Sequence, residues 1–559
     1  MKHIRLFLLI ISGILFFTAC QESEDEKNEP SVPEDSVPDK LTIEPESVTL
    51  EVGESCQLIA KLNGVPLEGN EVRWTPNSSL LSVDDNGKVT AVSYDEFVSG
   101  LSVKATIQEG QLYATCKITV YKSYNYKLRL ILKDKGHADY SLNQPEKFLS
   151  VRAIDRRRKR NIAIDDLDLP ISKDYLKQIE KVGGKIVSQS KWLKTVCVQC
   201  DDEALIDEYE KLPFVEDVIK VWRGEKKKRL QNIPAINNSF MTGNISDYSI
   251  EDYGDALGNI ILHNGQILHE RGFKGDGIEI AVIDAGFVNI LENPALSDIR
   301  IKGAKSFLYE DSNPYNTDEH GIGVTACMAT NKPGYYIGSA PEAGYWLLRS
   351  EDAISGDYPA EEDYWTAAIE YADSAGVDMV NTSLSYIQNE WPFPSHKFEE
   401  MDGKTAMPTR AANIAAGKGI FIVCCAGNNG SWVGTPADSP NVLTVGSVAA
   451  TGSIGPFTAY GMTVDGRMKP DVVALGSGVH TIDTEGSIVL RSGTSYASPI
   501  LCGLIACLWQ AYPWATNQDL LNVIKKSSDR YDSPMLPYGY GIVNIQKAID
   551  LLDSMQNKR

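Results

Sequence analysis

Ser495 lies in a local sequence that suits a catalytic nucleophile. The small-residue segment 493–499, GTSYASP, opens directly into residues 501–509, which are almost wholly apolar. Since this apolar run predicts a buried helix, the Ser495 hydroxyl and backbone N–H are expected at the positive N-terminal end of that helix. Pro499 is expected in the first turn, where the missing proline N–H leaves no hydrogen bond unmade. A serine held in this way can attack a carbonyl carbon if a general base lies nearby.

A histidine and an aspartate occur upstream in contexts that match such a base and its partner. Residues 278–283 have the apolar pattern of a buried strand that ends at Asp284. This placement puts the Asp284 carboxylate at the carboxyl edge of a sheet, where open α/β folds have their sites. His320 follows in the segment DEHGIGV, in which glycines allow close approach to a substrate and a helical pattern comes next. We therefore expect His320 to act as the base and Asp284 to orient it.

Asn428 is a candidate for stabilising negative charge on a reacting carbonyl oxygen. It follows residues 420–425, a third apolar strand pattern, in the segment AGNNG. Its side-chain amide and the backbone N–H of Ser495 would together form an oxyanion hole, and losing such a donor lowers turnover about 100- to 1000-fold. Each of these residues alone also has an ordinary explanation as a cap or turn residue. Their occurrence together favours catalysis.

The order Asp, His, Asn, Ser and the segments around them resemble the subtilisin family of serine peptidases, the subtilases. The resemblance covers residues 253–552 and extends to other segments, which are residues 338–341, 376–385 and 466–472. It implies that Ser495 attacks a peptide carbonyl while His320 accepts its proton. It also implies a polypeptide substrate, which would lie as an added strand along the enzyme.

The resemblance also assigns residues to substrate binding. These are Ser383, Leu384, Ser385, Cys425, Ala426 and Gly427. Ser385 stands where the family typically has glycine, so we expect a narrowed primary specificity pocket. Gly323 stands where a second histidine is usual, and Tyr496 where methionine is common; neither position takes part in proton transfer. Residues 330–336 lack the ligands of the family's calcium loop, so no metal is assigned and calcium stays open only through the resemblance.

The remaining length predicts further domains, because 559 residues exceed what one core usually serves. Basic residues precede an apolar run at 6–17, which is too short for the roughly 20 residues of a membrane span. Residues 17–20, FTAC, resemble a bacterial lipobox, which implies removal of residues 1–19 and lipidation of Cys20. An ordinary secretory signal is the alternative.

An acidic, proline-rich segment, residues 20–40, is predicted to be a disordered linker. An acidic run directly after a lipidated cysteine resembles the export tags of surface lipoproteins in some Gram-negative bacteria. A plain soluble linker explains the composition equally well. We therefore expect a lipid anchor in the outer membrane of the bacterial envelope, and which face of the membrane the protein occupies stays open.

Residues 41–121 show short alternating stretches between turn signals, which predict a β-sandwich. The pattern resembles bacterial Ig-like domains, with Trp74 as the core residue and residues 84–87 as a hairpin turn. A disulfide between Cys56 and Cys116 and a pair of free thiols are both compatible with the sequence. A spacer role is the commoner one for such a module, and binding of a surface glycan or protein is the alternative.

Residues 122–232 predict a small α+β domain. Alternating residues in 128–132 and 185–200 indicate strands, and Ser172 is expected to cap a helix that stops at Gly183. In order and position this domain resembles the ferredoxin-like propeptides of subtilases, which assist folding and block the active site.

Two basic clusters, residues 156–160 and 226–229, could suggest nucleic-acid binding or a processing site. The chain has 54 Lys and Arg against 75 Asp and Glu, for a net charge of -21, so a nucleic-acid surface is excluded. The second cluster lies where the α+β domain joins the candidate catalytic domain, and cleavage there is a hypothesis. Cys197 and Cys200 have metal-like spacing, but strand alternation places them on opposite faces and no second ligand pair follows.

The candidate catalytic domain, residues 233–559, alternates apolar strands with helices. This cadence predicts an α/β fold with a parallel sheet covered by helices on both faces, as in subtilisins. Two functions follow: a lipid-anchored serine endopeptidase, or a surface adhesin that uses an inactive peptidase scaffold. An esterase is a weaker third, because no Gly-x-Ser-x-Gly elbow surrounds Ser495.

Overall fold

The computed structural model divides the chain into two compact units, with the boundary between Lys122 and Ser123. The residues it describes are 38–95, 97–137, 139–225, 249–308, 311–315, 318–353 and 356–558. The predicted signal peptide, Cys20, most of the acidic linker and the basic cluster 226–229 lie outside these ranges. Within them, no helix combines the length and the apolar character that crossing a bilayer requires.

The first unit is all-β, as predicted. Its strands are β1 Leu41–Glu44, β2 Ser47–Glu51, β3 Ser55–Gln57, β4 Ile59–Leu62, β5 Val65–Pro66, β6 Arg73–Pro76, β7 Leu81–Val83, β8 Lys88–Ala91, β9 Ser102–Ile107 and β10 Leu112–Tyr121. They form sheets in the orders β2-β10-β9-β6, β1-β4-β5 and β3-β8-β7. Trp74 packs against the core, and Gly87, with a φ of +83°, turns the β7–β8 hairpin against the Trp74 ring. Cys56 and Cys116 are both free thiols.

The second unit begins with an α+β domain. Its elements are β11 Tyr124–Leu132, α1 Val151–Arg160, α2 Lys173–Val182, β12 Lys185–Ser190, β13 Thr195–Cys200, α3 Leu205–Glu210 and β14 Val215–Glu225. The four strands pair in the antiparallel order β12-β13-β11-β14. Ser172 caps α2 by accepting hydrogen bonds from the backbone N–H groups of Asp174 and Tyr175. Cys200 packs into the core of this domain, and Cys197 faces the other way.

Helix α1 is a feature that the sequence pattern did not predict. Its C-terminal half is the basic cluster 156–160, yet Arg156 and Arg157 are buried. Their burial is accounted for by acidic partners on the rest of the chain, described below.

The rest of the second unit is the predicted parallel α/β domain. Its sheet runs β16-β19-β15-β20-β21-β22-β25, all parallel. These strands are β15 Glu279–Asp284, β16 Arg300–Ser306, β19 Gly344–Arg349, β20 Met379–Thr382, β21 Phe421–Cys425, β22 Val442–Val448 and β25 Val472–Leu475. The helices are α4 Leu257–Ile261, α5 Gln266–Glu270, α6 His320–Ala329, α7 Pro359–Ala375, α8 Met407–Gly417, α9 Thr494–Ala511, α10 Asn517–Ser527 and α11 Ile545–Gln556. Short antiparallel pairs join β17 Asn331–Lys332 to β18 Tyr336–Ile337, β23 Gly461–Met462 to β24 Met468–Lys469, and β26 Ser477–Ile482 to β27 Ile488–Ser492.

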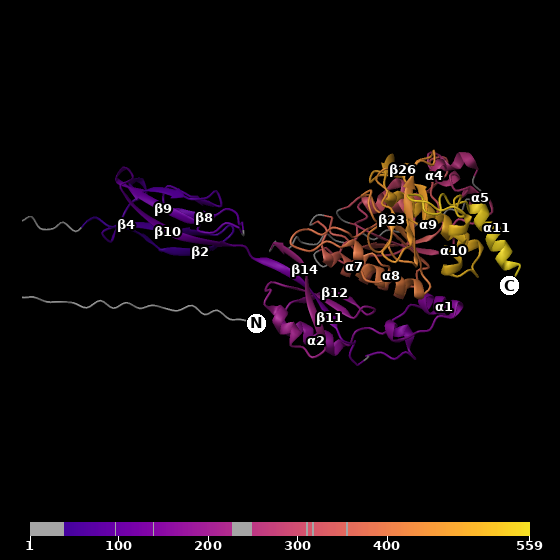
Figure 1. Ribbon diagram of the computed structural model, residues 1–559, viewed down its shortest axis with the longest axis horizontal. Coiled ribbons are helices and arrows are strands. Elements are labelled where there is room, and N and C mark those ends of the chain that lie inside the picture. Colours follow the sequence, from indigo (N-terminus) through magenta and orange to yellow (C-terminus); the bar gives the residue numbers. More distant parts are fainter. Residues whose placement is uncertain are drawn as a thin grey trace, which may run out of the picture. The chain divides into compact units, whose positions relative to one another are not determined.

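Helices cover both faces of the parallel sheet (Figure 1). Ile280 and Val282 of β15 enter the core formed with α6 and α9, whereas Ala281 and Ile283 enter the core formed with α7 and α8. Side chains of a strand alternate between faces, so a strand buried on both sides must be apolar throughout. The continuous apolar run before Asp284 is the result.

The α+β domain packs its sheet against α7, on the outer side of that helix (Figure 1). Arg129 of β11 bonds Asp363 of α7, with 2.6 Å between Nη2 and Oδ2. Glu370 of α7 accepts hydrogen bonds from Ser190 and from the backbone N–H of Lys191 at 3.0 Å. This interface therefore depends on acidic side chains of one helix face.

Pro499 lies inside α9, and the expectation that it occupies the first turn was wrong. Proline has no N–H to offer to the carbonyl four residues earlier, which belongs to Ser495. That carbonyl instead accepts a hydrogen bond from Ser383 Oγ at 2.9 Å. The proline thus frees one backbone acceptor, and the Ser383 side chain uses it to tie the start of α9 to the strand segment beside it.

Candidate active site

Asp284 and His320 form a carboxylate–imidazole pair at the carboxyl edge of the sheet, in which the carboxylate is buried and the imidazole is partly exposed. Asp284 is the last residue of β15 and is fully buried, and His320 is the first residue of α6. His320 Nδ1 lies 2.7 Å from Asp284 Oδ1, which also accepts a hydrogen bond from the backbone N–H of Ala285 at 2.8 Å. A carboxylate only accepts, so Nδ1 carries the proton and Nε2 is left for chemistry.

The carboxylate also controls the ionisation of the imidazole. Burial acts to lower the pKa of His320, but the charge of Asp284 and the hydrogen bond to it outweigh burial and raise this pKa to about 9. His263 shows the opposite outcome: it is buried and bonds the Val543 carbonyl, and burial lowers its pKa to about 4. The pKa shifts of the two histidines are opposite in direction because only His320 has a carboxylate partner.

Ser495 is the second residue of α9 and is only 6% exposed. Its Oγ lies 3.4 Å from the carbonyl oxygen of Ser383, and no hydrogen bond joins it to His320. Such bonds are often long or unmade until a substrate is bound. The structure therefore places the serine at the end of the sheet where the histidine pair lies, with its hydroxyl turned toward the neighbouring strand segment.

Asn428 is oriented by the first residue of α9. Its Oδ1 accepts hydrogen bonds from Thr494 N at 2.9 Å and from Thr494 Oγ1 at 3.0 Å. A backbone N–H can only donate, so the amide oxygen must face Thr494. The amide N–H groups then point elsewhere, and Nδ2 makes no hydrogen bond with the described part of the chain. Thr494 also accepts a hydrogen bond at Oγ1 from Gly427 N, at 3.1 Å. Thr494, which the sequence pattern did not single out, thus holds both ends of this turn.

The residues predicted to contact substrate lie together around this turn. Ser383, Leu384 and Ser385 follow β20, and the Leu384 carbonyl accepts from the thiols of Cys424 and Cys425, each at 3.6 Å. Ala426 and Gly427 continue from β21 toward Asn428, and Ala426 is fully buried.

Ser385 projects its hydroxyl between two glycines. A Cβ added to Gly434 would lie 2.6 Å from Ser385 Oγ, and one added to Gly427 would lie 3.4 Å from it. Ser385 Oγ is itself buried and has no hydrogen-bond partner among the described residues. The hydroxyl occupies space that the two glycines leave open, and whether it narrows a specificity pocket stays a prediction.

Two departures from the family pattern complement each other. A Cβ on Gly323 would lie 3.1 Å from the ring of Tyr496, so the small residue makes room for the large one. The Tyr496 ring in turn lies 5.9 Å from the His320 ring. Sequence inspection noted both residues but gave no sign that they touch.

A cavity of about 260 Å³ opens beside His320. It is lined by Asp318, Glu319, His320, Gly323, Ile482, Asp483, Arg491 and Tyr496. Arg491 and Glu319 form an ion pair of 2.9 Å at its rim. Residues 383–385, which were predicted to bind substrate, do not line this cavity.

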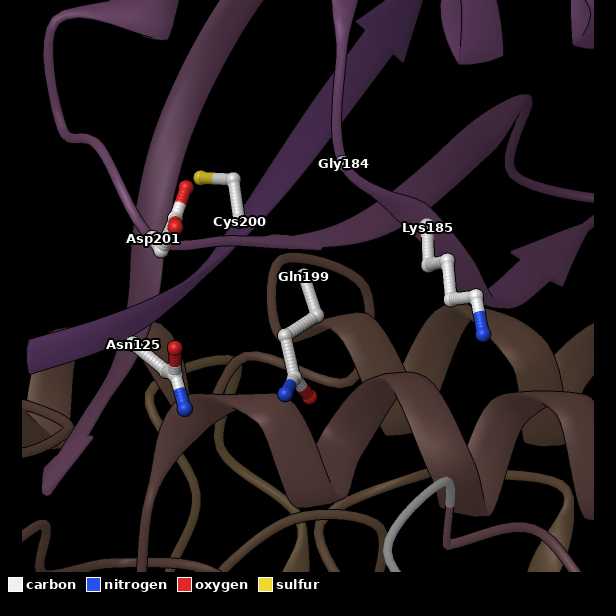
Figure 2. Close-up of a pocket in the computed structure, with 6 residues that line it drawn as sticks. All are labelled: Asn125, Gly184, Lys185, Gln199, Cys200 and Asp201. Carbon is white, nitrogen blue, oxygen red and sulfur yellow. The ribbon is translucent and has the colours of Figure 1, made fainter. Parts of the chain in front are cut away.

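A second pocket, of about 220 Å³, lies on the α+β domain and contains none of the candidate catalytic residues (Figure 2). Figure 2 shows the Cys200 thiol beside the Asp201 carboxylate at its upper side. Burial, opposed by a backbone hydrogen bond and reinforced by nearby carboxylates, raises the pKa of Cys200 to about 11, so this thiol is not a nucleophile.

Most of the segment 330–336, where the resemblance would put a calcium loop, lies in the β17–β18 hairpin. Across the described ranges, no group of three or more His, Cys, Asp or Glu side chains is arranged to hold a metal ion. No residue is therefore assigned as a ligand.

Comparison with known proteins gives two family matches along the chain and several similar peptidases. A model of the subtilase family matches residues 275–542, and a model of the peptidase S8 propeptide domain of Bacteroidota matches residues 127–234. Subtilisin NAT of Bacillus subtilis subsp. natto is 26% identical over 379 residues, which cover 66% of this chain and 84% of the relative. Subtilisin of Bacillus pumilus is 28% identical over 289 residues, or 50% of this chain and 94% of the relative. A thermostable alkaline protease of Halalkalibacterium halodurans is 27% identical over 349 residues, or 62% and 86%.

The pairing of His320 with Asp284 predicts opposite changes for two histidines. In an NMR titration of histidine-labelled protein, His320 should titrate well above the ordinary value of about 6.5. In the Asp284→Asn variant, burial acts without the charge, so the pKa of His320 should fall below about 6.5. His263 should titrate at the same low pH in both proteins. An unchanged His320 midpoint in the variant would show that Asp284 does not set its ionisation.

Proposed function

Because this chain belongs to the subtilase family of serine peptidases, we propose that it hydrolyses internal peptide bonds through a Ser495–His320–Asp284 mechanism. The observation that carries the proposal is the Asp284–His320 pair, with 2.7 Å between Oδ1 and Nδ1, at the same sheet edge as the helix that begins with Thr494 and Ser495. Asp284, His320 and Ser495 lie far apart in the sequence, and the fold brings them to one edge of the sheet.

In this mechanism Ser495 Oγ attacks the substrate carbonyl carbon while His320 Nε2 accepts its proton. Asp284 holds Nδ1 and stabilises the imidazolium that forms. The proton then passes to the leaving amine, and an acyl-enzyme remains. Water next attacks the acyl carbonyl while His320 accepts its proton, and Ser495 takes that proton as the acid is released. Because Asp284 raises the pKa of His320, the imidazole becomes an available base only as pH rises through that pKa.

Negative charge on the attacked oxygen would be met by two donors. One is the backbone N–H of Ser495 at the start of α9, where the helix dipole is positive. The other is Asn428 Nδ2, since its Oδ1 is already used by Thr494. Donors fixed before the reaction need no reorganisation when charge develops, which is the source of their effect.

A fluorophosphonate probe, which reacts with activated serines, tests the proposal. The purified protein, both intact and after cutting of the connection 226–248 with a specific protease, should be labelled, whereas Ser495→Ala should not be. Ser492→Ala removes an exposed serine three residues earlier and should label like the parent protein. Equal labelling of the parent and Ser495→Ala proteins would refute the assignment.

Absence of labelling in every form, together with retained binding to cell-surface glycans or proteins, would support the alternative of an inactive scaffold in an adhesin. That function has no geometric support comparable to the Asp284–His320 pair.

We expect the Ser385 side chain to reduce the space for the substrate side chain before the scissile bond, so that small residues are preferred there. With peptide substrates that vary only at this position, alanine should be favoured over phenylalanine. Ser385→Gly should raise the phenylalanine-to-alanine ratio of kcat/KM by about 10-fold or more, because one or two heavy atoms of pocket space are worth 1–3 kcal/mol. Cleavage after alanine serves as the internal control. A parent enzyme that prefers phenylalanine, or a ratio unmoved by the substitution, would contradict this role.

We further propose that the protein is a lipoprotein of the bacterial envelope, anchored through Cys20 in the outer membrane. The support is the sequence alone: basic residues, a short apolar run and FTAC at residues 17–20. In bacteria fed an alkyne fatty acid, the parent protein should carry the label and sediment with membranes. Cys20→Ser should lose the label, and a Cys20→Ser protein labelled as strongly as the parent would disprove lipidation at this residue.

A further inference from the structure

Residues 383–385, which we call the substrate segment, are connected through the next residue to a buried acid that the proposed mechanism does not use. Tyr386 directly follows the segment, and its hydroxyl donates to Glu351 Oε1 at 2.5 Å. Glu351 lies two residues beyond β19, whereas the substrate segment directly follows β20. Since β15 lies between β19 and β20 in the sheet, this hydrogen bond joins the chain on either side of the strand that ends at Asp284.

Glu351 is itself fixed relative to Asp284. Ser350 N donates to the Asp284 carbonyl at 3.1 Å, and Ser350 Oγ donates to Glu351 Oε1 at 2.9 Å. Arg349 Nε donates to the carbonyls of Ala285 and Glu351, at 3.0 Å and 3.4 Å. The chain around Glu351 therefore cannot shift away from the end of β15 without breaking these bonds.

Tyr386 also joins the substrate segment to the turn that faces it. Its backbone N–H donates to the Thr435 carbonyl at 3.0 Å, and Thr435 N donates back to the Tyr386 carbonyl at 3.2 Å. Thr435 follows Gly434, whose added Cβ would lie 2.6 Å from Ser385 Oγ. A shift of Tyr386 would therefore move the backbone on both sides of the Ser385 hydroxyl.

A second buried acid, Glu361 of α7, bonds the chain that follows Glu351. Its Oε1 accepts from Asp352 N at 2.8 Å, and its Oε2 accepts from Tyr358 N at 3.4 Å. Burial raises the pKa of Glu351 to about 7, and burial together with the charge of Glu351 raises the pKa of Glu361 well above its ordinary value. The hydroxyls of Tyr386 and Ser350 oppose burial at Glu351, so Glu351 is the first of the two acids to ionise.

The charge on Glu351 has no cationic partner. Within the described ranges its carboxylate is met by two hydroxyls, and the guanidinium of Arg349 pairs with Asp311 instead, at 2.5 Å. A buried carboxylate met only by neutral donors keeps part of its desolvation cost, which an apolar contact would avoid. The Tyr386–Glu351 bond therefore fixes the direction of the tyrosine side chain without being the most stabilising way to fill this space.

We propose that Glu351 is a positioning residue for peptide substrates, which acts through Tyr386 to hold the substrate segment at a fixed place relative to the Asp284–His320 pair. A peptide paired with that segment then has its scissile carbonyl aligned with Ser495. The inference rests on the proposed function and deepens it. It leaves the reactivity of the serine unchanged, because the side chains of Glu351 and Tyr386 make no hydrogen bond to His320 or Ser495 within the described ranges.

Tyr386→Phe, which removes only the hydroxyl, tests this role. With the connection 226–248 cut as in the labelling experiment, kcat/KM for a peptide with four alanines before the scissile bond should fall on the order of 10-fold. The rate of fluorophosphonate labelling should match that of the parent, because the probe is too small to pair with the substrate segment. Tyr345→Phe is the matched control: this buried hydroxyl donates to the Ala340 carbonyl at 2.7 Å at the amino edge of the sheet, so its loss should change neither rate.

Glu351→Gln separates the charge of the acid from its ability to accept a hydrogen bond. In the Ser495→Ala background, the Kd of the same peptide, made fluorescent, is measured against pH by anisotropy. Binding should tighten as pH rises through about 7, because ionised Glu351 is the stronger acceptor, and this change should be absent with glutamine. The acids that act on Glu351 are Asp284, Asp357 and Glu361, and all three are retained in both proteins.

Equal kcat/KM and equal peptide affinity in Tyr386→Phe, Tyr345→Phe and the parent would overturn the proposal. A parallel loss of peptide cleavage and probe labelling in Tyr386→Phe would also overturn it, since that result indicates a disturbed fold. A parent protein that neither labels nor cleaves would count against the proposed peptidase function, while peptide binding to the Ser495→Ala proteins would still decide the role of Glu351. No binding of the peptide by those proteins would count against that role.

Discussion

A carboxylate removed from water must be met by a cation or by hydrogen-bond donors, and this constraint applies at both edges of the parallel sheet. At the carboxyl edge of the sheet, the fully buried Asp284 is met by His320 and by a backbone N–H. At the amino edge, the equally buried Asp373 is met by Arg156 and Arg157. The first partner is an imidazole, which can gain and lose a proton, and the second is a pair of guanidiniums, which cannot. The first pair is therefore suited to proton transfer, and the second to holding the α+β domain against the parallel-sheet domain.

The parallel sheet is what allows the Asp284–His320 pair to form. Every strand points the same way, so the end of β15 and the turn after β21 meet at one edge, and the starts of α6 and α9 come to the same place. Ser383 then fixes the last element, because its hydroxyl bonds the Ser495 carbonyl that Pro499 leaves without a helical partner. Thr494 fixes Asn428 in the same way from the other side. The site depends on bonds between segment ends, with little contribution from any one element alone.

Much of this could be predicted from sequence where the signal is local. The apolar run before Asp284 identified its strand, and the small residues around Ser495 identified the start of its helix. The burial of Arg156 and Arg157 in the basic cluster 156–160 could not be predicted in this way. A run of charged residues predicts exposure to solvent unless its partners are known, and their partner Asp373 lies far along the chain. The same holds for Gly323 and Tyr496, each of which departs from the family pattern alone but which fit each other in space. Pro499 was placed in the first turn because sequence alone does not show that Ser383 supplies the missing bond.

Helix α7 contacts both the parallel sheet and the α+β domain. Its inner face, with Trp365 and Ala368, packs under the sheet that carries Asp284. Its outer face presents Asp363, Glu370 and Asp373, which lie on one side of the helix by their spacing and are each met by the α+β domain. Without the α+β domain, these three carboxylates on one helix face would lose the cations and hydrogen-bond donors that now meet them. The acidic outer face of α7 thus contacts the α+β domain, while its inner face supports the sheet that carries the candidate catalytic residue Asp284.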